Sequence, residues 1–467
     1  MRNTRDVRHL LVIGGGPGGY AAALYGAACG LEVTLIEKDQ VGGTCLHRGC
    51  VPAKTFLESA SVARTVRDAR RFGVSSSGGD VDLESLQARK DYVIGRLFRG
   101  LNGLLEARQI HVVKGRGVLI DGRTVAVHND GECQTITGDA VVIATGSTPV
   151  WPSYLEPDGT RIVTSDQFFD LDVIPRNVAV IGAGATGCEF ASALADFGAS
   201  VTLVERATQL LPIVDREITD LLAQRLSRRG IALRLSTAVR HTGSTSGHLI
   251  ELQMDGPDTL SVDLVVVSVG RRPLTDHLGL ENTRACTDES GYIQVDESGC
   301  TADPTVFAVG DVVPTPQLAH VAFAEAITAI KAITGVSAAN LPPEQIPLCI
   351  YTHPEVGVVG LTEDQARHRF ERVSIVRKSY AGNSRAAMLG ETDGLMKLVL
   401  GSNSDEATQI VGVHMVGPWA TEHVGQAMLA VSSGKDIDEL ARHVWPHPTL
   451  SETFGEAVLA ATGRPLH

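Results

Sequence analysis

Two cysteines five positions apart are the first residues of this 467-residue chain whose types and spacing could do chemistry. Cys45 and Cys50 lie in the segment GGTCLHRGCVPAK, residues 42–54. On a regular α-helix their Cα atoms would be roughly 8.7 Å apart, whereas a disulfide needs less than about 7 Å. A bridge would therefore require a distorted helix, which Gly49 and Pro52 tolerate. From spacing alone, a redox pair and two unpaired buried thiols both remain open.

A histidine near the C-terminus could accept the proton that thiol chemistry releases. The thiolate is the nucleophilic form of a thiol, and an imidazole can take its proton near neutral pH. His447 precedes Pro448, which predicts a loop before the final helix. Glu452 could orient the imidazole, while Thr449-Leu450-Ser451-Glu452 also fits a T-x-x-E capping box for that helix. The two roles of Glu452 are compatible.

A duplicated segment predicts the sheets that would position these side chains. Residues 9–38 and 177–206 each contain an apolar strand run, Gly-x-Gly-x-x-Gly, a helix of small residues and a strand ending in Glu. The first Gly makes a tight turn, the second lets the backbone approach a pyrophosphate, and the third lets the helix pack on the sheet. The Glu would accept hydrogen bonds from a ribose 2′-hydroxyl. These residues are Gly14, Gly16, Gly19 and Glu37, then Gly182, Gly184, Gly187 and Glu205. Two full copies predict two bound dinucleotides.

The acidic residue of the second repeat also bears on the choice of coenzyme. The carboxylate of Glu205 would repel a 2′-phosphate, which favours NAD(H) over NADP(H) at this site. Arg206 beside it weakens that inference, because an arginine there could accommodate a phosphate.

The domain organisation follows from the repeats and predicts an α/β protein. The strand TVFAVGDVV (305–313) ends in Gly310-Asp311 and suggests a return to the first domain, with the carboxylate at the ligand edge of its sheet. A plain Gly-Asp turn is the alternative for this pair. A Pro-containing linker, residues 340–347, precedes a region that alternates strands with Ala-rich helices, as an α+β domain would. The predicted domains are 1–150 with 274–345, then 151–273, then 346–467.

Composition excludes several classes of function. Lys and Arg number 41 against 54 Asp and Glu, a net charge of −13 without a basic cluster, which argues against binding nucleic acid or anionic membranes. No apolar run approaches the ~18 residues of a membrane span, and the first ten residues lack the apolar core of a signal peptide. We therefore expect a cytoplasmic protein. Eight cysteines are too few for a disulfide scaffold, and the six besides Cys45 and Cys50 are interpreted as structural; no metal site is predicted.

Together these motifs resemble the pyridine nucleotide–disulfide oxidoreductases over essentially the whole chain, and among them most closely the dihydrolipoamide dehydrogenases. The resemblance rests on GGTCLHRGCVPAK, both glycine repeats, ATGS, SVGRRP, Gly310-Asp311, YTHPEVGVVGLTE (351–363) and HPTLSE (447–452). It implies two Rossmann-like domains, with FAD in the first and NAD in the second, and a Cys45–Cys50 disulfide beside the flavin. It also implies a homodimer with the C-terminal domain as its interface.

The resemblance further implies roles for single residues in the NAD-linked oxidation of protein-bound dihydrolipoamide. Cys45 would exchange with the substrate and Cys50 would be the thiolate beside the flavin. His447, with Glu452, would act on the other subunit's disulfide. Lys54 and Glu189 would form an ion pair near the flavin. Further implied ligands are Gly43, Thr44, Lys54, Thr145, Gly146 and Asp311 for FAD, and Gly270 for NAD.

The chain departs from the family's pattern at a few positions. His47-Arg48 stands between the cysteines where many relatives have Asn and an aliphatic residue, and Trp445 replaces a second histidine before His447. Ala185 occupies the place of a tyrosine in glutathione reductases. Trp445 puts the shape of the substrate channel in doubt more than the chemistry, and Ala185 leaves the nicotinamide pocket more open. The positive charge at His47-Arg48 could favour a thiolate or lie on a solvated face, and both interpretations remain open.

Other activities of the same fold are disfavoured by particular residues. Glutathione reductase is disfavoured by Glu205 and Leu450, and mercuric reductase by a chain end, ATGRPLH, without a cysteine pair. A flavoprotein scaffold subunit would keep the glycines but lose the thiol chemistry, whereas Cys45, Cys50 and His447 are all present.

Overall fold

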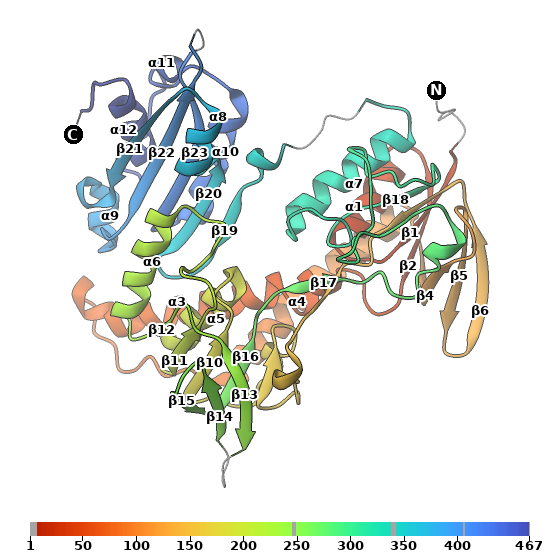
Figure 1. The fold of residues 1–467 in the computed structure, drawn as a ribbon, viewed down its shortest axis with the longest axis horizontal. Coiled ribbons are helices and arrows are strands. Elements are labelled where there is room, and N and C mark those ends of the chain that lie inside the picture. Colours follow the sequence, from red (N-terminus) through yellow and green to blue (C-terminus); the bar gives the residue numbers. More distant parts are fainter. Residues whose placement is uncertain (1–6, 245–248, 338–341, 405–406, 467) are drawn as a thin grey trace.

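The computed structural model describes residues 7–244, 249–337, 342–404 and 407–466. The predicted linker, residues 340–347, lies partly outside these ranges, at residues 340 and 341. Figure 1 shows an α/β chain with one parallel sheet at the right, a second parallel sheet at the bottom, and an antiparallel sheet at the upper left, drawn in blue. The predicted α/β class is confirmed.

The first parallel sheet has the strand order β18-β7-β1-β2-β3. Both faces of the sheet are covered, so successive residues of β1 are buried on opposite sides. Leu10 and Val12 pack against helices α1 and α7, whereas Leu11 and Ile13 pack against an antiparallel sheet, β4-β5-β6. The element bounds are β1 His9–Ile13, α1 Pro17–Ala28, β2 Glu32–Glu37, β3 His111–Lys114, β4 Arg116–Leu119, β5 Thr124–Asn129, β6 Glu132–Thr137, β7 Ala140–Ile143, β18 Val306–Ala308 and α7 Ala319–Ile333.

The second parallel sheet, β12-β11-β10-β16-β9, repeats this plan. Helices α5 and α6 pack on one face and the antiparallel sheet β13-β14-β15 on the other. The bounds are β9 Ile162–Thr164, β10 Asn177–Ile181, α5 Ala185–Asp196, β11 Ser200–Val204, α6 Arg216–Arg228, β12 Ala232–Arg234, β13 Val239–Ser244, β14 Ile250–Met254, β15 Thr259–Val262 and β16 Leu264–Val267.

Two strands, one leading from the first parallel sheet to the second and one leading back, lie side by side. The chain leaves the first sheet through β8 (Ser147–Pro149) and returns through β17 (Arg271–Pro273), and these strands pair antiparallel. β18 then pairs with β7, so the segment after the second sheet does rejoin the first. The domain boundaries given above stay a prediction.

The C-terminal sheet is antiparallel, in the order β19-β20-β23-β22-β21, with α10 and α12 packed on one face. On the other face Lys397, which is 3% exposed, reaches Asp215 at 3.0 Å, Glu217 at 3.1 Å and Glu363 at 2.9 Å. A buried cation needs such partners, and these fix α6 and α8 against the sheet. The bounds are β19 Leu348–Ile350, β20 Glu355–Gly360, α8 Glu363–Arg369, β21 Arg372–Ser379, α9 Ser384–Leu389, β22 Leu395–Ser402, β23 Gln409–Gly417, α10 Ala420–Ser433, α11 Ile437–Leu440 and α12 Glu452–Ala461.

Three more helices complete the site's surroundings. α2 (Gly43–His47) packs against α3 (Cys50–Asp68) and α4 (Leu83–Ala107), and α3 packs against α5 beside the second parallel sheet (Figure 1). Among the described residues, no helix combines the length and apolar character needed to cross a bilayer.

Candidate active site

The two glycine-rich turns have the same geometry at the two sheets. Gly14 and Gly182 both have φ +100, a left-handed conformation that side chains rarely adopt. A Cβ on Gly19 would overlap the Gly14 carbonyl oxygen, and one on Gly187 would overlap that of Gly182. The third glycine therefore lets each helix sit directly on its strand.

In each of the two repeats, the acidic residue at or just after the end of the second strand contacts the glycine-rich loop. Glu37 accepts hydrogen bonds from the backbone N–H of Gly15 at 2.5 Å and of Asp39 at 2.7 Å. Glu205 accepts them from Ala183 at 2.7 Å and Ala207 at 2.8 Å. Because a carboxylate offers about four acceptor positions, each can hold its loop and still accept a hydroxyl.

The cysteine motif lies against the first of these turns. The Gly42 N–H donates to the Gly15 carbonyl at 2.7 Å, and a Cβ on Gly43 would come within 2.7 Å of the Gly16 Cα. Gly43 and Thr44 are the first two residues of the short helix α2, which carries Cys45. The first dinucleotide site and the cysteine pair are therefore neighbours.

The helix is interrupted between the cysteines, as a bridge would require. α2 ends at His47 and α3 begins at Cys50, with Gly49 at φ −136 and ψ −109 between them. Cys45 and Cys50 are free thiols in the structure, and the disulfide that the resemblance implies stays a prediction. The Cys45 and Cys50 side chains interact, and a hydrogen bond between them is the largest influence on the pKa of each thiol.

This contact gives the two thiols different acidities. The hydrogen bond from Cys45, aided by the charge of Lys54 and opposed by burial, lowers the pKa of Cys50 to about 7. The same hydrogen bond, together with burial, raises the pKa of Cys45. Cys50 is also the first residue of α3, where the helix dipole favours an anion. In the reduced pair, the negative charge is therefore favoured on Cys50 and the proton on Cys45.

Lys54 lies one helical turn after Cys50 and is paired. Its Nζ is 2.9 Å from Oε1 and 2.8 Å from Oε2 of Glu189, which is 4% exposed. Glu189 also accepts the Tyr351 N–H at 2.9 Å, and the Lys54 ammonium lies 4.7 Å from the centre of the Tyr351 ring. The ion pair thus fixes a positive charge near Cys50 and joins α3 to α5.

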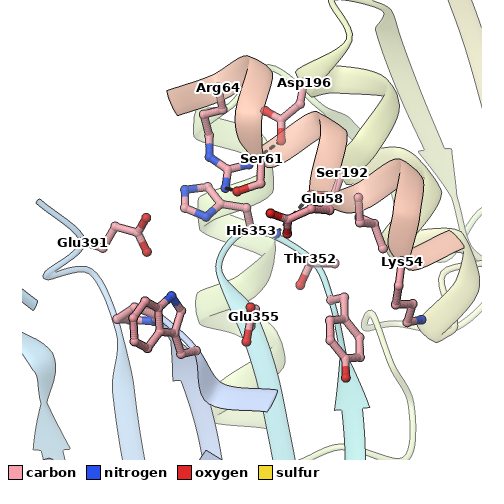
Figure 2. A pocket seen from close by; sticks show the side chains of 14 residues that line it. Lys54, Glu58, Ser61, Arg64, Ser192, Asp196, Thr352, His353, Glu355 and Glu391 are labelled. Carbon is pink, nitrogen blue, oxygen red and sulfur yellow. Dashed lines mark hydrogen bonds and ion pairs between the residues drawn. The ribbon is translucent and has the colours of Figure 1, made fainter. Parts of the chain in front are cut away.

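A polar cavity of about 200 Å³ adjoins Lys54 along α3 (Figure 2). In it Arg64 donates to Asp196 at 2.6 Å, across 132 sequence positions. Burial, with repulsion from Arg64 and other arginines, lowers the pKa of His353 to about 3, so this histidine is neutral. The sequence analysis assigned a site role to Lys54 alone among the residues that line this cavity; His353 lies in the family motif of residues 351–363, and the pairing of Arg64 with Asp196 had no sequence signal.

His447 and Glu452 form a pair remote from these elements along the chain. His447 is exposed, and its Nδ1 lies 2.8 Å from Oε2 of Glu452, the first residue of α12. The predicted capping box is wrong. Ser451 rather than Thr449 is the N-cap residue, and it makes no side-chain cap bond. The Thr449 hydroxyl donates instead to the Pro446 carbonyl at 2.7 Å, which leaves Glu452 to the imidazole.

Both residues of the His47-Arg48 segment between the cysteines make contacts with neighbouring residues. Arg48 pairs with Asp39 at 2.9 Å on the exposed surface. The His47 ring lies edge-on to Phe98 at 5.3 Å and its Nε2 is 2.9 Å from the Val41 carbonyl oxygen. Arg48 therefore lies on the exposed surface, whereas His47 is half-buried against Phe98.

Comparison with known proteins decides the family. The model of the pyridine nucleotide-disulphide oxidoreductases matches residues 8–326, and that of their dimerisation domain matches residues 346–458. The chain belongs to this family.

Its relatives are similar over nearly their whole length. A dihydrolipoyl dehydrogenase of Bacillus subtilis (strain 168) is 38% identical, with 98% of each chain covered, and one of Geobacillus stearothermophilus is 35% identical, with 98% of this chain and 97% of that protein covered. The crystal structure of LpdA from Mycobacterium tuberculosis has a TM-score of 0.91 at 27% identity, covering 97% of this chain and all of the other. HOCl-induced flavoprotein disulfide reductase RclA from Escherichia coli has a TM-score of 0.85 at 25% identity, covering 97% of this chain and 99% of the other.

Membership makes the protein a flavin-dependent, NAD-linked disulfide oxidoreductase with a dimerisation domain, so the predicted family, enzyme class and cofactors are confirmed. The residues present fit both dinucleotides. A Cβ built on Gly16 or Gly184 would meet no atom within 4 Å, which leaves space above each turn. Gln317 lies between β18, a strand of the first sheet, and α7. Among the described residues, its side-chain Nε2 is one of the buried polar atoms without a hydrogen-bond partner, so it has a free donor.

The other predicted flavin ligands gather at that edge. Asp311, after β18, accepts a hydrogen bond from Ser147 at 2.5 Å. The Thr145 hydroxyl, after β7, donates to the Leu274 carbonyl at 2.7 Å, and Gly146 has φ +76. Gly270, with φ +125, follows β16 at the corresponding edge of the second sheet. Their contacts with FAD and NAD stay predictions.

The electrostatics of the pair yield a first prediction. Lys54→Met should raise the pKa of the Cys50 thiol from about 7 toward that of an ordinary cysteine, about 8.5, because it removes a cation and leaves the Glu189 carboxylate unpaired. The thiolate would then form at higher pH, by about one unit or more. The ultraviolet thiolate absorbance of the reduced, flavin-free protein, followed against pH, measures this. Lys114→Met, at the exposed end of β3, is the matched control; an unchanged profile in Lys54→Met contradicts the assignment.

Proposed function

We propose that the protein oxidises the dihydrolipoyl group of a lipoyl-bearing protein to the cyclic disulfide, with NAD⁺ as the final acceptor. The observation that carries the proposal is the placement of the Cys45–Cys50 pair, at a break between two helices, against the first glycine-rich turn and one helical turn from the Lys54–Glu189 ion pair. The names of the curated relatives supply the substrate, since those quoted above are dihydrolipoyl dehydrogenases. We place the reaction in the cytoplasm, where a disulfide that forms and breaks is usually catalytic.

The thiol chemistry follows from the chain's own residues. In the oxidised enzyme, His447 accepts a proton from one substrate thiol, and the thiolate attacks Cys45 of the disulfide. The S–S bond breaks, and Cys50 leaves as the thiolate that its low pKa favours. The second substrate thiol attacks the mixed disulfide, which releases lipoamide and returns Cys45 as a thiol.

The electron pair now on the dithiol must reach NAD⁺. FAD, when bound, supplies the two-electron relay that takes the pair from Cys50 and passes it on as hydride. Cys50 and Cys45 re-form their disulfide and one proton is released. Lys54, fixed by Glu189, stabilises negative charge beside the flavin. Gly182, Gly184, Gly187, Glu205 and Gly270 hold NAD.

The proposed site is shared between two subunits. His447 is 71% exposed and its imidazole points to solvent from the loop before α12, held only through Nδ1 among the described residues. α12 packs on β21 at the outer side of the C-terminal sheet, whereas α3 packs on α5 below it (Figure 1). We propose that His447 of the partner subunit serves Cys45, so that the homodimer is the active unit.

Steady-state oxidation of dihydrolipoamide tests the substrate and the coenzyme together. We expect NAD⁺ to be reduced, with kcat/KM at least about 100-fold higher than with NADP⁺, equivalent to about 2.7 kcal/mol. The reason is repulsion between the Glu205 carboxylate and a 2′-phosphate. Free and protein-bound dihydrolipoyl groups are compared in the same assay. If NADP⁺ is the better acceptor, the role of Glu205 is wrong; if neither coenzyme is reduced, the substrate is wrong.

A second candidate is a disulfide reductase with a different substrate. The likeness in fold to the HOCl-induced disulfide reductase favours it, since that fold carries the same kind of chemistry. NADH-driven reduction of a panel of small disulfides separates the two, because the first proposal expects lipoamide to react fastest.

A further inference from the structure

The loop that carries His447 is anchored on its N-terminal side by Trp445. The indole packs against Phe454 of α12, with ring centres 5.4 Å apart. It also covers Gly455 so closely that a Cβ there would overlap the indole ring. A tryptophan at 445 and a glycine at 455 are therefore matched in shape, and the match ties the residue two positions before His447 to the helix behind it.

A second anchor, Asn383, holds the C-terminal side of the loop. Asn383 is 6% exposed and precedes α9. Its Nδ2 donates to the Thr449 carbonyl at 2.9 Å and to the Thr453 hydroxyl at 3.0 Å, while its Oδ1 accepts the Ala386 N–H at 2.9 Å. One buried amide thus bridges the start of α9 to the residue two positions after His447.

His447 itself has little to hold it. Its imidazole is 71% exposed and pairs with Glu452. A side chain this exposed is positioned by its backbone and by that one partner. The backbone on either side is fixed by contacts at residues 445 and 449, and the Thr449 hydroxyl closes the loop by donating to the Pro446 carbonyl at 2.7 Å.

We propose that Asn383 and Trp445 are positioning residues for His447. The assignment rests on the proposed function, in which His447 takes the substrate proton. A base on a loop at a subunit boundary must meet a sulfur atom on another chain, and a displacement of about 1 Å can cost about 100-fold in rate. Asn383 acts through Thr449 and Thr453, and Trp445 acts through Phe454 and Gly455. Neither touches the substrate.

Asn383→Asp is the sharpest test, because the carboxylate can still accept the Ala386 N–H but cannot donate to Thr449 or Thr453. We expect kcat for dihydrolipoamide to fall about 10- to 100-fold, with KM and FAD content unchanged. NADH-driven reduction of ferricyanide, which bypasses the thiols and His447, should keep its wild-type rate. Thr362→Ala, which removes the N-cap of α8 in the same domain, is the matched control and should change neither rate.

Trp445 provides an independent variant if Asn383→Asp folds poorly. Trp445→Ala empties the space over Gly455 and should lower the dihydrolipoamide rate selectively, while Trp445→Phe, which keeps a ring against Phe454, should restore much of it. Equal loss of dihydrolipoamide oxidation and ferricyanide reduction would mean that these residues only stabilise the fold. An unchanged dihydrolipoamide rate in both Asn383→Asp and Trp445→Ala would overturn the positioning role but leave the proposed function standing. A wild-type chain that does not oxidise dihydrolipoamide overturns the proposed function and this assignment with it.

Discussion

Cys50→Ser is expected to reduce NAD-linked oxidation of dihydrolipoamide by at least about 1,000-fold, as removal of an essential catalytic group does in other enzymes. A serine can neither form the disulfide nor leave as an anion at neutral pH. The effect should be confined to the thiol half of the reaction. FAD content and NADH-driven reduction of ferricyanide should stay near wild type, because the glycine-rich turns do not depend on the Cys50 sulfur.

The companion variant Cys45→Ser separates the roles of the two thiols. It should also abolish turnover, but it leaves Cys50 with a hydroxyl donor in place of the Cys45 thiol. With the flavin oxidised and no reductant added, Cys45→Ser should therefore show the long-wavelength absorbance of a thiolate against the flavin, and Cys50→Ser should lack it. Cys133→Ser, an exposed cysteine on β6, is the control. A band that survives in Cys50→Ser would falsify the assignment of the thiolate.

Local sequence predicted those parts of the site that local geometry determines. The spacing of Gly14, Gly16 and Gly19 specifies a turn whose atoms all lie within one strand–helix unit, and the structure has that turn twice. The helix break between Cys45 and Cys50 follows from disulfide geometry for the same reason.

Contacts between distant segments were not accessible in this way. The hydrogen bonds of Asn383 to Thr449 and Thr453 span 66 and 70 positions, and the pairing of Arg64 with Asp196 spans 132. Such contacts depend on how whole elements pack, which no short motif records. The ion pair of Lys54 with Glu189 spans 135 positions and was expected only through the family resemblance.

Even short motifs misled where two uses of one residue competed. The pattern from Thr449 to Glu452 fits a capping box, yet Thr449 bonds to Pro446 and Glu452 to His447. The sequence does not say which acceptor a hydroxyl will choose. This arrangement suits the proposed function, because a Glu452 carboxylate bonded to a backbone N–H would be less free to orient the His447 imidazole.

His447→Gln is expected to reduce dihydrolipoamide oxidation by about 100- to 10,000-fold, the range that general acid–base catalysis contributes. The amide can occupy the same space but cannot take the substrate proton at neutral pH. Ferricyanide reduction and FAD content should not change. Glu452→Gln, which still accepts a hydrogen bond from Nδ1, should cost less, about tenfold, because only the charge is lost. His443→Gln, an exposed neighbour on the same segment, is the control.

Mixed dimers then decide whether the base and the thiols belong to different subunits. In a dimer of one Cys50→Ser and one His447→Gln chain, a shared architecture gives one site with both defects and one with neither. If each chain supplied its own base, both sites would be defective. Dissociation and random reassociation of equal amounts should therefore restore about a quarter of wild-type activity, because half of the dimers are mixed and each has one intact site of two. No recovery, in preparations shown by differently tagged subunits to contain mixed dimers, would place His447 in the same subunit as the thiols it serves.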